Sequence, residues 1–162
     1  MGVHRFQIFA DYFQFILMDE ASEDDAGLLW TSENSAEWLI DIGQSTLGLG
    51  TLRNVDVAVD IHIGAHAPFY SPNAFDHLVE GSIYFPTGNL LIMGGTEALS
   101  TARRITVYPG SYRLLYALRG VETIKLEHEP ADDVYSLFIW PAEQGSTILH
   151  KHWKSSQVHA SQ

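Results

Sequence analysis

Cysteine is absent from all 162 residues of the chain. A disulfide framework and a Cys-ligated metal or iron–sulfur site are therefore both excluded, and the absence fits a reducing compartment. The sequence has no apolar run of about 18 residues, the length that a membrane-spanning helix needs. Its N-terminus also lacks the basic start and apolar segment of a signal peptide. We therefore expect a cytoplasmic protein that makes no contact with a membrane.

Positive charge is scarce as well. The chain has 9 Lys and Arg against 20 Asp and Glu, a net charge of −11. Direct binding to nucleic acid needs clustered basic residues, so this composition argues against it. The acids concentrate early: residues 1–60 hold 11 of them against two bases, and Asp24 and Asp25 lie in the most acidic segment, residues 18–27. This is either an ordinary acidic surface or a patch that attracts a basic protein partner.

The familiar catalytic motifs are missing too. The sequence contains no GxSxG nucleophile motif, no phosphate-binding P-loop and no HExxH metal motif. Carboxylate pairs of the kind that hydrolyse glycosides stay open, because the fold rather than sequence spacing sets them. We predict a protein that is not an enzyme and that needs no cofactor.

Short runs with a period of two residues dominate what is present. They are rich in β-branched and aromatic residues and are bounded by Gly, Pro, Asn or Asp, which is typical of strands. About ten such runs predict an all-β fold, a two-sheet antiparallel β-sandwich, with one or two short helical turns at Ser32–Trp38 and Gly95–Arg104. Residues 1–153 are expected to form a single domain, and residues 154–162 a polar tail.

Three segments carry turn chemistry, and two tyrosines lie beside turns. Pro86–Asn89 predicts a hairpin, and Tyr108–Tyr112 and Leu118–Glu122 predict further turns in which a glycine takes a positive φ. Tyr112 and Tyr135 each stand at the start of a strand, where a tyrosine often hydrogen-bonds back across the turn. We interpret both as structural residues.

The segment VDVAVDIHIGAHAP, Val55–Pro68, alternates most regularly. One face is aliphatic, while the other carries carboxylates and imidazoles, which zinc accepts as ligands. A metal site made from Asp60, His62, His66 and His77 is therefore one hypothesis. The simpler alternative is that the polar face is the solvent side of a sandwich strand.

Aromatic residues are numerous: 4 Trp, 7 Tyr and 8 Phe. Most are expected in the core, but they could also form a sugar-binding platform. Trp30, Trp38 and Tyr70 border the acidic or loop segments. Because tight protein interfaces are anchored by buried Trp, Tyr or Arg, we select these three, with Asp24 and Asp25, as candidate partner-binding residues.

The order of several short motifs is also informative. The chain runs through FQIFADYFQFILMD, a Trp at position 30, VAVDIHI, SIYFPTGNLLIMG, ITVYPGSYRLLYAL and DDVYSLFIWPA. Over roughly residues 5–140 this layout resembles the competence protein J (ComJ) family, bacterial β-sandwich proteins that inhibit a DNA-entry nuclease. It also resembles a wider set of bacterial sandwiches, some of which look like toxin-immunity partners. The segment Ala65–Glu80 and the strand ILHKHW depart from that pattern.

The resemblance implies a non-catalytic binding protein that inhibits a basic nuclease or toxin. It carries no binding residue over to this chain. The alternative is a sandwich that binds a small ligand or carbohydrate, and the metal site is a third hypothesis.

Overall fold

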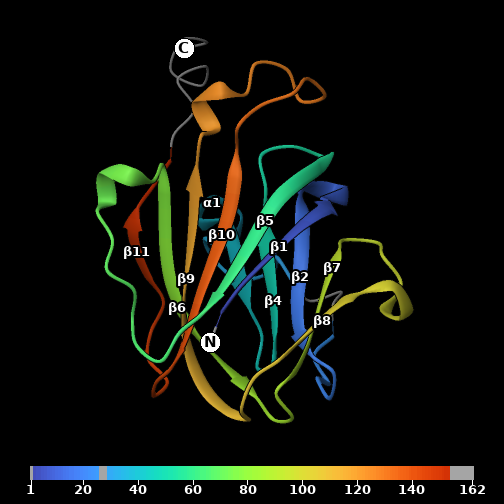
Figure 1. The fold of residues 1–162 in the computed structure, drawn as a ribbon, viewed down its shortest axis with the longest axis vertical. Helices are drawn as coiled ribbons and strands as arrows, with labels where there is room; N and C mark the ends of the chain where they lie inside the picture. Colours follow the sequence, from blue (N-terminus) through green and yellow to red (C-terminus); the bar gives the residue numbers. More distant parts are fainter. Residues whose placement is uncertain (1, 26–28, 154–162) are drawn as a thin grey trace.

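The computed structural model describes residues 2–25 and 29–153, which form two packed β-sheets (Figure 1). The larger sheet has the strand order β1-β5-β10-β9-β6-β11. Its strands are β1 (Gly2–Phe9), β5 (Asp56–Ile63), β6 (His77–Phe85), β9 (Gly110–Arg119), β10 (Val134–Pro141) and β11 (Ile148–Lys151). The smaller sheet has the order β3-β4-β2-β7-β8. Its strands are β2 (Gln14–Asp19), β3 (Ile40–Ile42), β4 (Thr46–Gly50), β7 (Asn89–Gly94) and β8 (Arg103–Thr106).

In residues 2–25 and 29–153 helical structure is limited to short turns, so the predicted all-β sandwich is confirmed. The helix α1 (Ser35–Trp38) lies within one of the two predicted helical segments. The other contains only a 3-10 turn, Leu99–Thr101, before the chain enters β8. Further 3-10 turns are Asp11–Phe13, Pro72–Ala74 and Val121–Thr123. In the part of the chain that the structure describes, no helix is long and apolar enough to cross a membrane.

The core lies between the two sheets, and β5 shows how alternation builds it. Val57, Val59 and Ile61 are buried in the core, as the aliphatic face of that segment predicts. The other face departs from the prediction, because Asp60 is only 6% exposed rather than solvated. β5 runs antiparallel to β1 but parallel to β10. An entirely antiparallel sandwich is therefore not observed, and pairing this distant in sequence leaves no local signal.

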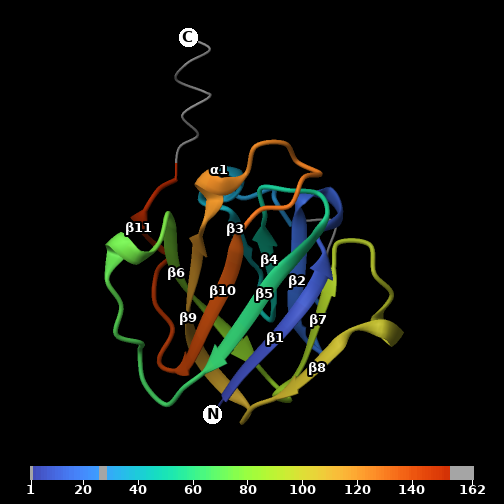
Figure 2. The ribbon, with the colours of Figure 1, turned by 45° about the horizontal axis from the view of Figure 1, so that its top comes forward.

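The connection between β1 and β2 is a tight turn that interrupts the extended conformation of the chain. After Phe9 the chain forms the turn Asp11–Phe13 and passes from the larger sheet to the smaller one. Tyr12 and Phe13 both take a φ of 59°, in the left-handed region. Two such residues in succession reverse the chain, and Figure 2 shows β1 and β2 on opposite layers on either side of this turn.

The structure confirms the predicted turns and the predicted structural role of Tyr112. Gly88, in the hairpin between β6 and β7, has a φ of +77°. A Cβ there would collide with the carbonyl oxygen of Val107, so the position requires glycine. The Tyr112 hydroxyl donates to the carbonyl oxygen of Tyr108 at 2.6 Å, the back-bond expected of a tyrosine corner.

Asp19 belongs to the acidic segment of residues 18–27, but its side chain does not lie on the surface. It ends β2 and is completely buried. Its carboxylate accepts hydrogen bonds from the backbone N–H groups of Ala21, Thr87 and Gly88 and from the Thr87 hydroxyl. Burial alone would raise the pKa of Asp19, but these hydrogen bonds outweigh it and lower that pKa. The carboxylate therefore fastens the β6–β7 hairpin to β2.

His77 is the first residue of β6, at the end of the strand away from the hairpin, and is completely buried. Its Nε2–H donates to the carbonyl oxygen of Trp38 at 2.7 Å, and its Nδ1 accepts the backbone N–H of Trp153 at 3.1 Å. This arrangement requires a neutral ring, because a protonated Nδ1 accepts nothing. Burial lowers the pKa of His77; the bond to Trp38 opposes this shift and the nearby His152 adds to it.

The lowered pKa of His77 predicts a loss of stability in mild acid. Below pH about 6.5, the ordinary pKa of histidine, His77 is protonated in the unfolded chain but stays neutral in the folded one. The free energy of unfolding therefore falls by up to about 1.4 kcal/mol for each pH unit. This contribution is complete above that pH and disappears as the pH falls through the folded-state pKa. Urea unfolding of the wild type and of His77→Gln at pH 7.5, 6.5 and 5.5 measures it. The variant is expected to show the shallower slope, and parallel slopes would contradict the role of His77.

Candidate interaction surface

Four connections meet at one end of the sandwich, which we call the loop end. They are residues 9–13 between β1 and β2, 51–55 between β4 and β5, 95–102 between β7 and β8, and 120–133 between β9 and β10. In both ribbon views residues 51–55 and 120–133 lie at the end where β5 begins and β1 ends, while the connection from β7 to β8 starts near that end and extends along the side of the smaller sheet (Figures 1 and 2). The Thr96 hydroxyl donates to the Asp11 carboxylate, which joins the start of that connection to the β1–β2 turn. Loops held by a rigid sandwich are common locations for binding residues.

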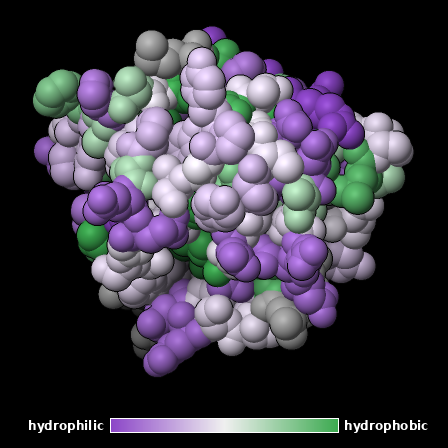
Figure 3. Space-filling model, turned by 90° about the horizontal axis from the view of Figure 1, so that it is seen from below, coloured by the Kyte–Doolittle hydropathy of each residue, from purple (hydrophilic) through white to green (hydrophobic). Residues whose placement is uncertain are grey.

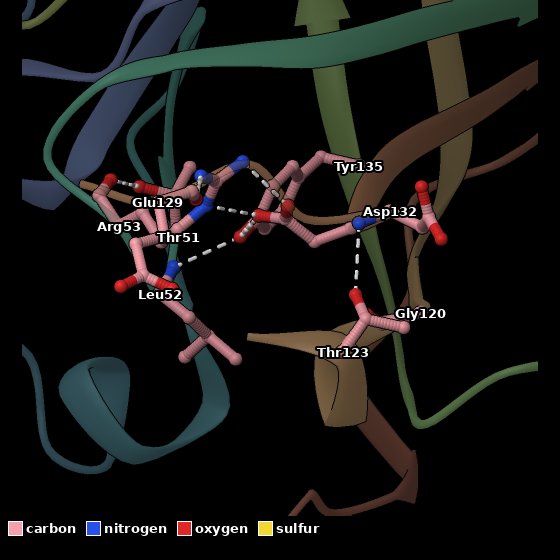
Figure 4. A network of polar contacts seen from close by, with 9 residues as sticks. Thr51, Leu52, Arg53, Gly120, Thr123, Glu129, Asp132 and Tyr135 are labelled. Atoms are coloured by element: carbon pink, nitrogen blue, oxygen red, sulfur yellow. Dashed lines mark hydrogen bonds and ion pairs between the residues drawn. The ribbon is translucent and has the colours of Figure 1, made fainter. Parts of the chain in front are cut away.

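A buried ion pair holds the base of the loop end. The Arg53 guanidinium donates from Nη2 to Asp133 Oδ1 at 2.6 Å and from Nε to Asp133 Oδ2 at 3.1 Å. Both side chains are almost completely buried. The remaining Nη1 donates to the carbonyl oxygen of Glu129 at 2.8 Å (Figure 4). The bidentate geometry fixes the orientation of Arg53 and joins residues 51–55 to residues 120–133.

Tyr135 extends this network, as its predicted structural role requires. Its hydroxyl donates to Asp133 Oδ2 at 2.7 Å and accepts the backbone N–H of Leu52 at 3.1 Å. Burial raises the pKa of Tyr135 well above its usual value, so the hydroxyl remains a neutral donor. Figure 4 shows Tyr135 beside Leu52 and Arg53, which come from the neighbouring connection.

Two further side chains shape the loops above the network. The Thr123 hydroxyl donates to the carbonyl oxygen of Gly120 and accepts the N–H of Asp132, which closes residues 120–133 on themselves (Figure 4). Asn54 links two loops: its side-chain oxygen accepts the Tyr12 N–H, and its own N–H donates to the Glu127 carboxylate. The β1–β2 turn is thereby tied to the loop end.

The outer surface of the loop end is acidic and partly apolar. Its acids outside the buried pair are Asp11, Glu97, Glu122, Glu127, Glu129 and Asp132, and the only Lys or Arg besides Arg53 within these four connections is Lys125. Several apolar side chains are exposed among them: Phe9, Tyr12, Phe13, Leu99 and Leu126. Acidic residues around exposed aromatic ones are suited to a partner that carries cations around an apolar recess.

The five predicted partner-binding residues are dispersed. Asp24 accepts hydrogen bonds from the N–H groups of Gln44 and Ser45 at the β3–β4 turn, while Asp25 is exposed nearby in the chain. Trp30 is half-buried and donates from Nε1 to the Gln14 side chain.

Trp38 packs against the core from the helix α1. Tyr70 lies beside His150 of β11, on the larger sheet. None of these five residues belongs to the loop end, and whether they bind a partner stays a prediction.

The predicted metal ligands are only partly brought together. His62 Nε2 lies 3.0 Å from Asp60 Oδ1. His66 is exposed, and both ring nitrogens of His77 are already hydrogen-bonded to Trp38 and Trp153. Within residues 2–25 and 29–153, no group of three or more His, Asp or Glu is placed to hold a metal ion.

His62 and His66 instead line an open depression on the outer face of the larger sheet. Phe138 and Trp140 form part of its wall, and its volume is about 320 Å³. The ring of His62 stacks on Phe138 at 4.4 Å between centroids. Imidazole donors beside aromatic faces are groups that small polar ligands use.

The fold of this chain is similar to two solved structures. A crystal structure of ComJ from Bacillus subtilis, an inhibitor of the DNA-degrading activity of NucA, superposes with a TM-score of 0.61 at 13% identity, over 88% of this chain and 96% of that one. The chain has the ComJ fold. A protein described as crocagin biosynthetic gene J superposes with a TM-score of 0.59 at 20% identity, over 88% of this chain and 98% of that chain. No protein-family model and no curated protein sequence matches.

The predicted resemblance to ComJ is therefore confirmed for the fold. Two surface residues that sequence reasoning missed are Tyr12 and Phe13, because they lie inside an aromatic run, FQIFADYFQF, whose composition is typical of a strand. A signal was available: neighbouring side chains of a strand point to opposite faces, so the adjacent aromatic residues Tyr12 and Phe13 cannot both lie in the core of one strand.

The hydrogen bonds of the Tyr135 hydroxyl predict that removing this oxygen atom lowers the free energy of unfolding. Tyr135→Phe leaves the Leu52 N–H and the Asp133 carboxylate each short of a partner, so we expect the free energy of unfolding to fall by about 1–2 kcal/mol. Urea denaturation measures this change. The matched control is Tyr84→Phe on β6, an exposed tyrosine whose substitution should change the value by less than about 0.5 kcal/mol. Equal midpoints for the two variants would contradict the structural role of the Tyr135 hydroxyl.

Proposed function

We propose that this protein is a non-catalytic, cytoplasmic binding protein that inhibits, or gives immunity to, a basic nuclease or toxin. The observation that carries the proposal is the fold shared with ComJ over 88% of this chain and 96% of that one, since ComJ inhibits the DNA-degrading activity of NucA. Folds host many functions, so the charge of the molecule is the independent support. A net charge of −11 favours a basic partner over an acidic one.

An acidic inhibitor has a direct physical route to blocking a nuclease. An enzyme that binds DNA presents cations to the phosphate backbone, and exposed carboxylates can compete for the same cations. Electrostatic attraction of this kind mainly accelerates encounter, by about 10- to 1,000-fold at low ionic strength. The acids of the loop end outside the buried pair are positioned for this because all but Asp11 are exposed.

DNA degradation by NucA, and by any nuclease encoded beside the gene for this protein, tests the proposal. We expect stoichiometric inhibition that weakens as salt is raised. The triple variant Glu97→Gln/Glu127→Gln/Glu129→Gln should lower the association rate by about tenfold at low salt. The matched control, Glu33→Gln/Glu37→Gln/Glu143→Gln, removes the same charge from exposed positions outside the loop end. Full nuclease activity at a molar excess of the protein at low salt would exclude the inhibitor role for that nuclease.

A second candidate function is binding of a small polar ligand or carbohydrate. It is favoured by the depression in which His62 and His66 lie beside Phe138 and Trp140. An exposed aromatic or imidazole ring can stack on the apolar face of a sugar, and a ring nitrogen can hydrogen-bond its hydroxyl groups.

NMR titration with mono- and oligosaccharides tests this second candidate. Binding is expected to shift the signals of His62 and His66, and His66→Ala should weaken it by about tenfold through loss of one hydrogen-bonding group. His128→Ala, an exposed histidine at the loop end, is the matched control. Uniformly unchanged spectra across the sugars would remove this candidate.

A further inference from the structure

The turn between β1 and β2 combines backbone strain with exposed aromatic residues. Tyr12 and Phe13 are consecutive, and each has a φ of 59°. For a bulky side chain a positive φ is rare, and it costs on the order of 1–2 kcal/mol per residue. Glycine or asparagine would take the same conformation at lower cost. The aromatic residues at these two positions are therefore not what the backbone alone prefers.

The surrounding structure enforces this conformation. The Tyr12 N–H donates to the Asn54 side chain at 2.9 Å, and the carbonyl oxygen of Phe13 accepts the Thr51 N–H at 2.9 Å. On the other side, a Cβ on Gly94 would collide with the carbonyl oxygen of Phe9, and one on Gly95 with that of Asp11. The turn is thus clamped between residues 51–55 and the start of residues 95–102, so the side chains it carries have a fixed direction.

Burial does not explain the aromatic residues either. Tyr12 is 72% exposed, Phe9 50% and Phe13 44%. Within the described residues, the Tyr12 hydroxyl has no hydrogen-bond partner. Exposed aromatic side chains on a rigid backbone lose little conformational entropy when a partner buries them. Strain that persists without a folding benefit is typical of functional positions.

The residues around the turn indicate what kind of partner fits it. Asp11 lies within it and accepts the Thr96 hydroxyl, Glu97 follows Thr96, and Glu127 is tied through Asn54. Acids therefore border the aromatic side chains from three of the four connections. A complementary surface would carry an apolar recess with lysines or arginines on its rim.

We propose that Phe9, Tyr12 and Phe13 are the anchor of the interface with a basic protein partner, with Tyr12 inserted into an apolar recess on that partner. The inference rests on the proposed function in one respect, that the partner is a protein such as a nuclease. It assigns the contact to the loop end and not to the dispersed residues Trp30, Trp38 and Tyr70. Tyrosine is enriched in interface hot spots, and the rim around the buried centre of an interface is polar.

The first experiment needs no partner. Tyr12→Asn removes the aromatic ring while keeping a residue that tolerates a positive φ. If Tyr12 serves binding and not folding, the melting temperature should stay unchanged or rise by up to about 4 °C. The control is Tyr108→Asn, an 89% exposed tyrosine in the β8–β9 turn at the opposite end of the sandwich. That end shows only small, separate hydrophobic areas among hydrophilic residues (Figure 3). A clear fall in the melting temperature of Tyr12→Asn would make the ring structural and overturn the proposal.

The second experiment measures inhibition by the same variants in the nuclease assay. Tyr12→Asn should weaken inhibition by at least about tenfold and Tyr108→Asn should not. Wild-type inhibition that survives intact in Tyr12→Asn overturns the anchor while leaving the inhibitor role standing. If the wild type inhibits no nuclease, the proposed function fails instead, and the melting temperatures alone then decide whether the ring is held for folding.

Discussion

The ion pair between Arg53 and Asp133 is the contact on which the loop end depends. It joins the segment that leaves the smaller sheet to the segment that enters β10 of the larger sheet. Burying two charges is costly, so such a pair adds little net stability over an apolar one. Removing either partner, however, strands a buried charge and costs about 3–5 kcal/mol. The pair therefore specifies one arrangement of these loops, because alternative arrangements would leave Arg53 or Asp133 alone.

A short chain of hydrogen bonds connects the Arg53–Asp133 pair to the outer surface of the loop end and fixes the conformation of that surface. Arg53 donates a hydrogen bond to the carbonyl oxygen of Glu129. The next residue, Asn54, accepts the Tyr12 N–H with its side-chain oxygen and donates its own N–H to the Glu127 carboxylate. A strained turn can persist only where its surroundings determine it completely. The conformation of Tyr12 and the placement of the acids near it thus have a common origin in the interior of the sandwich.

Sequence reasoning reached the parts of this fold that local patterns encode. Alternation identified the buried face of β5, and Pro-Gly or Gly-Asn pairs identified the turns at Gly88 and Gly110. It missed Asp19, because an acidic residue beside a run of acids gives no sign that four hydrogen bonds will bury it. The Arg53–Asp133 pair was also out of reach, since its partners lie 80 residues apart. The candidate interaction surface depends mostly on contacts of this second kind.

This chain and ComJ share a fold at 13% identity, so the sandwich can be built from very different side chains. At that level of identity the likeness shows a common arrangement of strands, and a binding surface has to be argued from this chain's own residues. In such a scaffold the sheets supply rigidity, and the connections can vary without loss of the core. The aromatic residues at positions 12 and 13 lie in one of these connections, where nothing in the core demands them. A partner is the simplest physical reason for keeping large apolar side chains on a strained, exposed turn, because water and the backbone both disfavour them there.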